Sequence, residues 1–142
     1  MKFFIKSAFG GVHVRSEEGD YLFKSRLFSH SSVLLGENKK VVASLHRTSW
    51  WRMDFTLTTG QYSYQFKQRF SSSTLSLNDS ELEFYTTSGH DFFIGSEAAT
   101  RIEPEGLTVK KYHVEILKTE HWLALLIATC LELQSSMVTK AG

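Results

Sequence analysis

The chain has 142 residues, a formal net charge of +1, 42% hydrophobic residues and 22% charged residues. These values are typical of one soluble domain, and they exclude a disordered chain and a collagen-like repeat. A single cysteine cannot form an intramolecular disulfide, so a disulfide scaffold is excluded as well. The near-zero net charge gives no sign of a strongly basic nucleic-acid-binding protein. Residues 1–142 are therefore expected to form a single domain.

The most apolar stretches are too short for a secretion signal or a membrane span. Only three apolar residues separate Lys2 from Lys6, whereas a signal peptide needs about 7 to 15. The longest apolar run, residues 122–131, has ten residues, whereas a helix that crosses a bilayer needs about 20. We therefore expect no transmembrane segment, and a cytoplasmic protein that is at most peripheral at membranes.

Residues up to about 117 show the pattern of β-strands. Short apolar and aromatic runs alternate with polar residues, and turn-forming residues separate the runs at intervals that fit strands of about five to nine residues. Connections this short join antiparallel neighbours, because a parallel pair needs a crossover of about a dozen residues. Residues 2–117 are therefore predicted to form antiparallel strands.

A weak repeat groups these strands in pairs. Its copies begin with an apolar and then a basic residue, at Phe23, Leu45 and Phe66, which lie 22 and 21 residues apart. A second alternating run follows each copy, so residues 23–35, 45–57 and 66–77 are each predicted to form a hairpin. Stacking of the hairpins gives a meander.

The period changes after one more strand, at residues 110–117. From Glu120 to Gln134 almost every residue favours a helix, and Thr119 is placed to be its N-cap. Apolar residues occur all around this helix, so it has to be buried on all sides. The sequence thus predicts a mainly β fold, a closed antiparallel β-barrel formed by residues 2–117 that encloses a hydrophobic C-terminal α-helix at about residues 120–135.

The same residues resemble a known family. The three hairpin repeats, and above all YHVEIL at 112–117 followed by WLALLIATCL at 122–131, are similar to the tubby C-terminal-like superfamily and in particular to its LURP-one-related branch. The resemblance covers essentially the whole chain and implies a barrel of about 12 strands around a central helix. It also implies phosphoinositide binding, as in tubby proteins, although many LURP-one-like members have no known activity.

Catalytic signatures are sparse. The sequence has no G-x-S-x-G, H-E-x-x-H, P-loop or G-x-G-x-x-G motif. His90 and Asp91 are adjacent and would point to opposite faces of a strand, which favours a turn over a catalytic dyad. Trp122 and Cys130 are expected in the core. We predict no catalytic residue, no metal site and no cofactor, and an enzyme that uses His90 or Asp91 is the least favoured alternative.

Basic residues of the repeat carry the main functional signal. Alternation puts them opposite the apolar residues, so they would line the outside of every second strand, about 10 Å apart. The balance of charge is +6 in residues 1–71 and −5 in residues 72–142, which favours a positive side that meets phosphate. The alternative is that these cations have no ligand and only contact solvent, as on the outer strands of most soluble barrels. The residues of this predicted positive stripe are Lys24, Arg26, His46, Arg47, Lys67 and Arg69.

Two tryptophans stand beside the stripe. If Trp50 and Trp51 lie in a strand or its hairpin tip, one of them points outward, and next to Arg52 it would suit a membrane interface. Packing across the barrel rim is the alternative.

The leading hypothesis for function is a non-catalytic binding domain that recognises phosphoinositide or another anionic phosphate-bearing ligand through its basic outer strands. The alternative is a protein-interaction or structural module without lipid binding. The expected partner is thus an anionic phospholipid or a protein, and the sequence does not fix the oligomeric state.

Overall fold

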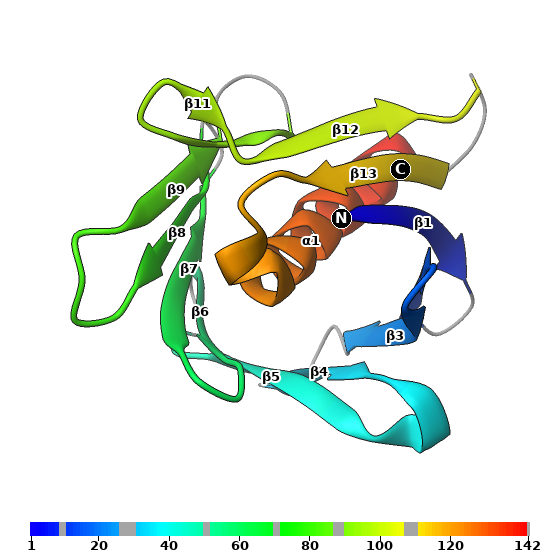
Figure 1. Cartoon of the computed structure of the whole chain (residues 1–142), viewed down its shortest axis with the longest axis horizontal. Coiled ribbons are helices and arrows are strands. Elements are labelled where there is room, and N and C mark those ends of the chain that lie inside the picture. Colours follow the sequence, from blue (N-terminus) through cyan, green and yellow to red (C-terminus); the bar gives the residue numbers. More distant parts are fainter. Residues whose placement is uncertain are drawn as a thin grey trace.

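The structure is a computed structural model that describes residues 1–8, 11–25, 31–49, 52–69, 72–86, 90–106 and 111–141. In these residues thirteen strands form one antiparallel sheet, and a long α-helix, α1 (Trp122–Ala141), follows them. The sheet curls around α1 into a nearly closed barrel (Figure 1). The predicted fold class, mainly β with a barrel around a C-terminal helix, is confirmed.

The strands form a meander in which each strand up to β11 pairs with the next along the chain, and β12 and β13 complete the sheet beside β1. A short 3₁₀ turn, η1 (Glu37–Lys39), follows β4, and a second, η2 (Thr119–His121), follows β13. The strands are β1 (Lys2–Ala8), β2 (Gly11–Ser16), β3 (Gly19–Ser25), β4 (Ser31–Leu35), β5 (Val41–Arg47), β6 (Met53–Thr58), β7 (Ser63–Gln68), β8 (Thr74–Leu77), β9 (Glu83–Thr86), β10 (Phe92–Ile94), β11 (Glu97–Ala98), β12 (Thr100–Pro104) and β13 (Lys111–Ile116).

The three repeats form hairpins, as predicted. β3 pairs with β4, β5 with β6, and β7 with β8. The apolar residue that begins each copy points into the barrel, since Phe23, Leu45 and Phe66 are at most 2% exposed. The alternation of inward apolar and outward polar residues therefore sets which face of each strand meets the helix.

Residues 124–131 of α1 are buried on all sides, as predicted from the apolar residues of this segment. Each of residues 124–131 is at most 5% exposed, and eight residues make more than two turns of helix. Thr119 is not the N-cap that we predicted: it opens η2, whose N-cap is Lys118, and no side chain caps that turn. α1 itself begins at Trp122 and continues to Ala141, further than the predicted end.

The first and the last strand of the chain lie side by side within the sheet. β1 and β13 pair over five residues, from Lys2 opposite Glu115 to Lys6 opposite Lys111. Because the first strand and the last strand lie side by side, the outer face at this point combines residues from both ends of the sequence.

Side chains complete the closure between β10 and β12. Thr100 Oγ1 accepts a hydrogen bond from the Phe92 backbone N–H at 2.8 Å, and Asp91 Oδ1 accepts one from the Ile102 N–H at 2.8 Å. The Ala99 N–H also donates to the Phe92 carbonyl at 2.7 Å. Pro104, the one proline of the chain, ends β12, where the missing N–H interrupts no ladder.

The burial of α1 predicts how two leucines differ. Leu125 is fully buried, whereas Leu123 on the same helix is only partly buried. We expect Leu125→Ala to lower the free energy of unfolding by about 2–5 kcal/mol, because it leaves a cavity at the centre of the barrel. The matched Leu123→Ala should cost clearly less. Urea unfolding of both variants measures this, and equal losses would contradict the enclosed position of the helix.

Candidate anion-binding site

The predicted positive stripe lies on the outside of the barrel, near one rim. Lys24, His46 and Lys67 are exposed, and each is the next-to-last residue of its strand, β3, β5 or β7. Because alternate strands of a meander run in the same direction, the three residues approach the same end of the barrel. The outward positions of these residues are as the alternation predicts.

A carboxylate interrupts the stripe. Asp54 on β6 pairs directly with Lys67 on β7, and its Oδ1 accepts a hydrogen bond from Arg69 Nη1 at 2.5 Å. The hydrogen bond from Arg69, helped by the positive charges of Arg69, Lys67 and Arg52, lowers the pKa of Asp54 despite its partial burial. An incoming phosphate would have to compete with this carboxylate for Arg69.

The other residues of the stripe have different positions. Arg47 supports the connection between β5 and β6, because its Nε donates to the Ser49 carbonyl at 2.8 Å and to the Arg52 carbonyl at 3.3 Å. Arg52 is exposed at the start of β6. Three of the predicted residues, Arg26, Trp50 and Trp51, lie outside the described residues.

The structure brings a different set of basic residues together, on the outer face of β13, β1 and β2. They line a cavity of about 370 Å³, which we call the basic pocket, formed by Phe4, Lys6, His13, Arg15 and Lys111. Lys6 lies opposite Lys111 on one side and opposite His13 on the other. These residues therefore form one row across three adjacent strands, which lie about 4.7–4.9 Å apart.

Acidic residues lie beside the basic pocket but do not line it: the Glu105 N–H donates to the Lys111 carbonyl, which puts Glu105 opposite Lys111. No carboxylate is among the described residues that line it, and Asp20, which lies opposite Arg15 on β3, does not line the pocket. Like charges directly opposite each other on neighbouring strands repel, by roughly 0.2–1 kcal/mol. A bound anion would replace this repulsion with charge-assisted hydrogen bonds.

The basic pocket was not predicted, because its residues come from strands far apart in the sequence, β1 and β2 near the start and β13 near the end. A usable signal was present: alternation places Lys2, Phe4 and Lys6 on the face opposite the core residues Phe3 and Ile5. Closure of a meander then makes its first strand a neighbour of its last. Together, these two facts would have indicated a basic outer face.

His90 and Asp91 do not act as a pair. The buried His90 Nδ1 has no hydrogen-bond partner among the described residues and lies 4.0 Å from Glu132 Oε2, whereas Asp91 accepts a hydrogen bond from the backbone of β12. Glu132 accepts a hydrogen bond from the Ser73 hydroxyl. Burial raises the pKa of the Cys130 thiol to about 12, which leaves it without thiolate character at neutral pH.

A buried histidine lies where α1 enters the barrel. His121 Nδ1 and the Tyr64 hydroxyl are 2.7 Å apart, and the rings of Tyr62 and Phe84 pack on the imidazole with centroids 5.4 and 5.9 Å away. Burial raises the pKa of Tyr64 to about 12, so its phenol stays neutral. These contacts fix the start of the helix against β7 and β9.

Comparisons with family models, with curated proteins and with solved structures found no match to this chain. Across the described ranges of the chain, no helix combines the length and the apolar character that crossing a membrane requires.

The ion pair in the stripe predicts how stability depends on pH. The folded-state pKa of Asp54 lies below the ordinary value of 3.8. The ionised Asp54 therefore stabilises the fold above about pH 4. This stabilisation is lost as the pH falls through the lowered pKa. We expect Asp54→Asn to reduce stability modestly at pH 7, and we expect this loss to shrink as the pH falls below the ordinary pKa of 3.8. Urea midpoints of the wild type and the variant, measured from pH 7 down into the acid range, follow the difference. A gap that does not narrow as the pH falls would refute the assignment.

Proposed function

We propose that this chain is a non-catalytic binding domain that recognises an anionic, phosphate-bearing ligand through basic side chains on its outer strands. The observation that carries the proposal is the row of Lys111, Lys6 and His13, with Arg15 beside it, around one pocket. Its lining offers an incoming group the cations of Lys6, Lys111 and Arg15, an imidazole and an aromatic ring.

The chemistry of these side chains suits a phosphate group. Lys6 and Lys111 supply compact positive charges, and the planar guanidinium of Arg15 can donate two parallel hydrogen bonds to phosphate oxygens. Each residue stands on a strand of the nearly closed sheet, so the backbone ladder holds the row in place before the ligand arrives. Binding then costs little ordering of the site.

The phosphate has two sources with the same chemistry: the headgroup of a phosphoinositide and a soluble phosphate ester. The resemblance to the tubby C-terminal-like superfamily favours the headgroup, and the proposal therefore includes a cytoplasmic protein that binds at the surface of a membrane. Each cation near an anionic membrane surface contributes about 1 kcal/mol. The exposed Lys24 and Lys67 would add to this attraction.

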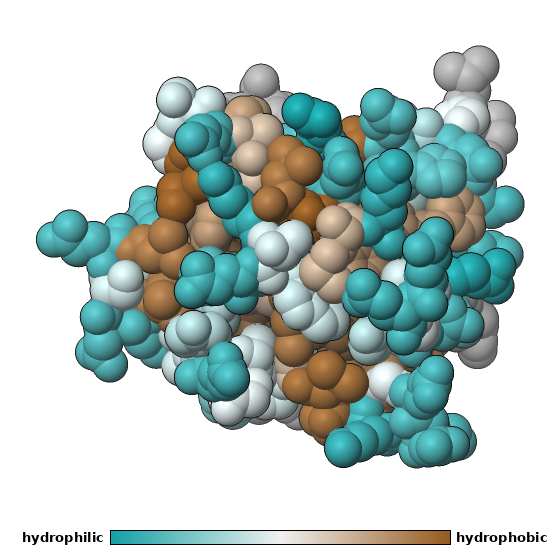
Figure 2. Space-filling view, in the orientation of Figure 1, coloured by the Kyte–Doolittle hydropathy of each residue, from teal (hydrophilic) through white to brown (hydrophobic). Residues whose placement is uncertain are grey.

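A protein-interaction module is the alternative. Val41 is 55% exposed and Met53 is 39% exposed, but these two apolar residues lie at the first positions of different strands. Figure 2 shows hydrophobic side chains in several groups between hydrophilic ones. Scattered apolar residues are normal on protein surfaces, so the alternative has less support than the basic pocket.

The proposal predicts that two lysines of the basic pocket matter more than two lysines elsewhere. We expect Lys6→Gln with Lys111→Gln to weaken binding of inositol trisphosphate and of phosphoinositide-containing vesicles by about tenfold or more. A matched control, Lys39→Gln with Lys40→Gln, removes the same charge from exposed residues of the connection after β4 and should leave the affinity within about twofold of the wild type.

Calorimetry with the soluble headgroup and co-sedimentation with vesicles separate the two sources of phosphate. Equal loss in both double variants would mean that net charge alone drives binding and would overturn the assignment of the pocket. Absence of binding to soluble phosphates and to vesicles alike would overturn the proposed function.

A further inference from the structure

Phe4 departs from the polar pattern of the outer face. Among the described outward side chains of β13, β1 and β2, it is the one large apolar residue, and the rest are charged or histidine. Its ring packs on that of His113, with centroids 5.1 Å apart and planes inclined at 48°. It also lies opposite Arg15 on β2. An aromatic side chain that breaks the local pattern beside a charged pocket is a candidate for ligand contact.

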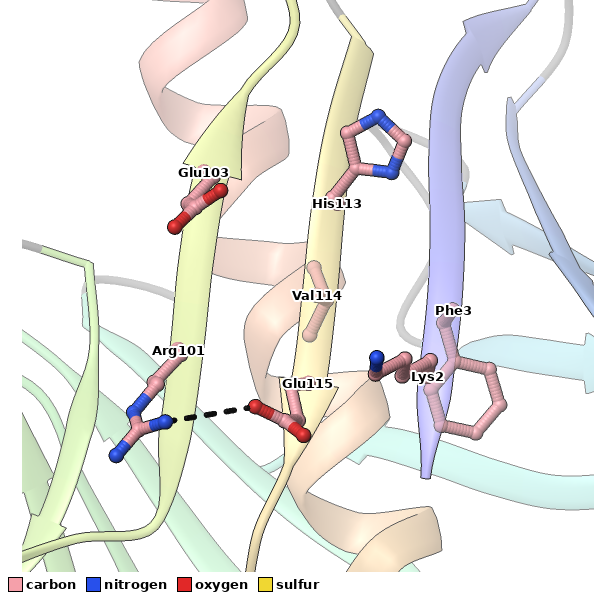
Figure 3. Close-up of a pocket in the computed structure, with 7 residues that line it drawn as sticks. All are labelled: Lys2, Phe3, Arg101, Glu103, His113, Val114 and Glu115. Atoms are coloured by element: carbon pink, nitrogen blue, oxygen red, sulfur yellow. Dashed lines mark ion pairs between the residues drawn. The ribbon is translucent and has the colours of Figure 1, made fainter.

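A second hollow lies next to this ring pair. Its volume is about 340 Å³, and its charged lining residues come from β1, β12 and β13: Lys2, Arg101, Glu103 and Glu115 (Figure 3). We call it the mixed pocket, because it contains both signs of charge. Arg101 Nη1 lies 3.7 Å from Glu115 Oε1. A polar group without net charge can accept a hydrogen bond from Arg101 and donate one to Glu115 at the same time.

The two pockets and the ring pair follow one another along the strands. Lys6 and Lys111 form the first row, Phe4 and His113 the second, and Lys2 and Glu115 the third. Successive rows are two residues apart, which is about 6.6 Å along a strand. His113 lines the mixed pocket and Phe4 lines the basic pocket, so the ring pair is their common boundary.

We infer that this face binds a nucleoside phosphate, with the phosphate in the basic pocket, the flat base against the ring pair and the polar edge of the base toward the mixed pocket. The inference rests on the proposed function and narrows its ligand class. A base stacks on an aromatic ring because it has a flat π-face. The saturated ring of an inositol phosphate carries hydroxyl groups instead and gains nothing from Phe4.

Calorimetric titration with AMP, ribose 5-phosphate and inositol trisphosphate tests the inference. AMP and ribose 5-phosphate share the phosphate and the sugar, so their difference reports the base. We expect the wild type to bind AMP at least about fivefold more tightly than ribose 5-phosphate. Phe4→Leu should abolish this preference and weaken the binding of AMP more than that of ribose 5-phosphate, because Lys6, Lys111 and Arg15 still hold the phosphate.

Two further variants make the test specific to the ring of Phe4. Phe4→Tyr keeps an aromatic ring and should keep the preference for AMP, which guards against misfolding of Phe4→Leu. Phe93→Leu makes the same change at a partly buried residue of β10, which packs on Tyr85, and should leave both affinities unchanged.

The outcomes separate this inference from the proposed function. Equal binding of AMP and ribose 5-phosphate, or equal weakening of both by Phe4→Leu, overturns the nucleoside phosphate and leaves a phosphate site. Tight binding of inositol trisphosphate with no binding of AMP also overturns the nucleoside phosphate and leaves a phosphate site. Failure of all three compounds and of phosphoinositide vesicles overturns both proposals.

Discussion

The need to keep α1 away from water determines the rest of this structure. A helix with one apolar face can lie on an open sheet, but residues 124–131 of α1 are buried in every direction. Only a sheet that surrounds the helix provides that burial, and a surrounding sheet must bring its first and last strands together. The pairing of β1 with β13 and the hydrogen bonds of Thr100 and Asp91 at the other seam are thus consequences of one hydrophobic helix.

Closure also changes what the charge distribution means. The first half of the chain is basic and the second half acidic, yet Lys111 from the acidic half lies beside Lys6 from the basic half. Acidic residues of the second half lie close by: Glu105 lies opposite Lys111, and Glu115, in the mixed pocket, lies opposite Lys2 and near Arg101. The distribution of charge on the surface is therefore set by the register of neighbouring strands and not by the order of charged residues along the chain.

Alternation and repeats were sufficient to predict the hairpins, the inward residues such as Phe23 and Phe66, and the burial of the helix, because each depends on local spacing. Local spacing could not predict the basic pocket or the position of Asp54 beside Lys67. Both depend on which residues face each other across two strands. That register is set by turns and by barrel closure. Thr119 failed as an N-cap for a related reason, since a 3₁₀ turn precedes α1 and shifts its start.

Cross-strand partners, rather than the presence of cations, distinguish the two basic surfaces. In the stripe, Lys24 lies opposite Val33 and Lys67 opposite Asp54, so each cation has a neutral or acidic neighbour, as is usual where a strand meets solvent. Lys6 lies opposite Lys111 on one side and His13 on the other, and the two lysines repel each other across their strands. This lysine pair on adjacent strands of the nearly closed sheet is the feature on which the proposed anion binding rests.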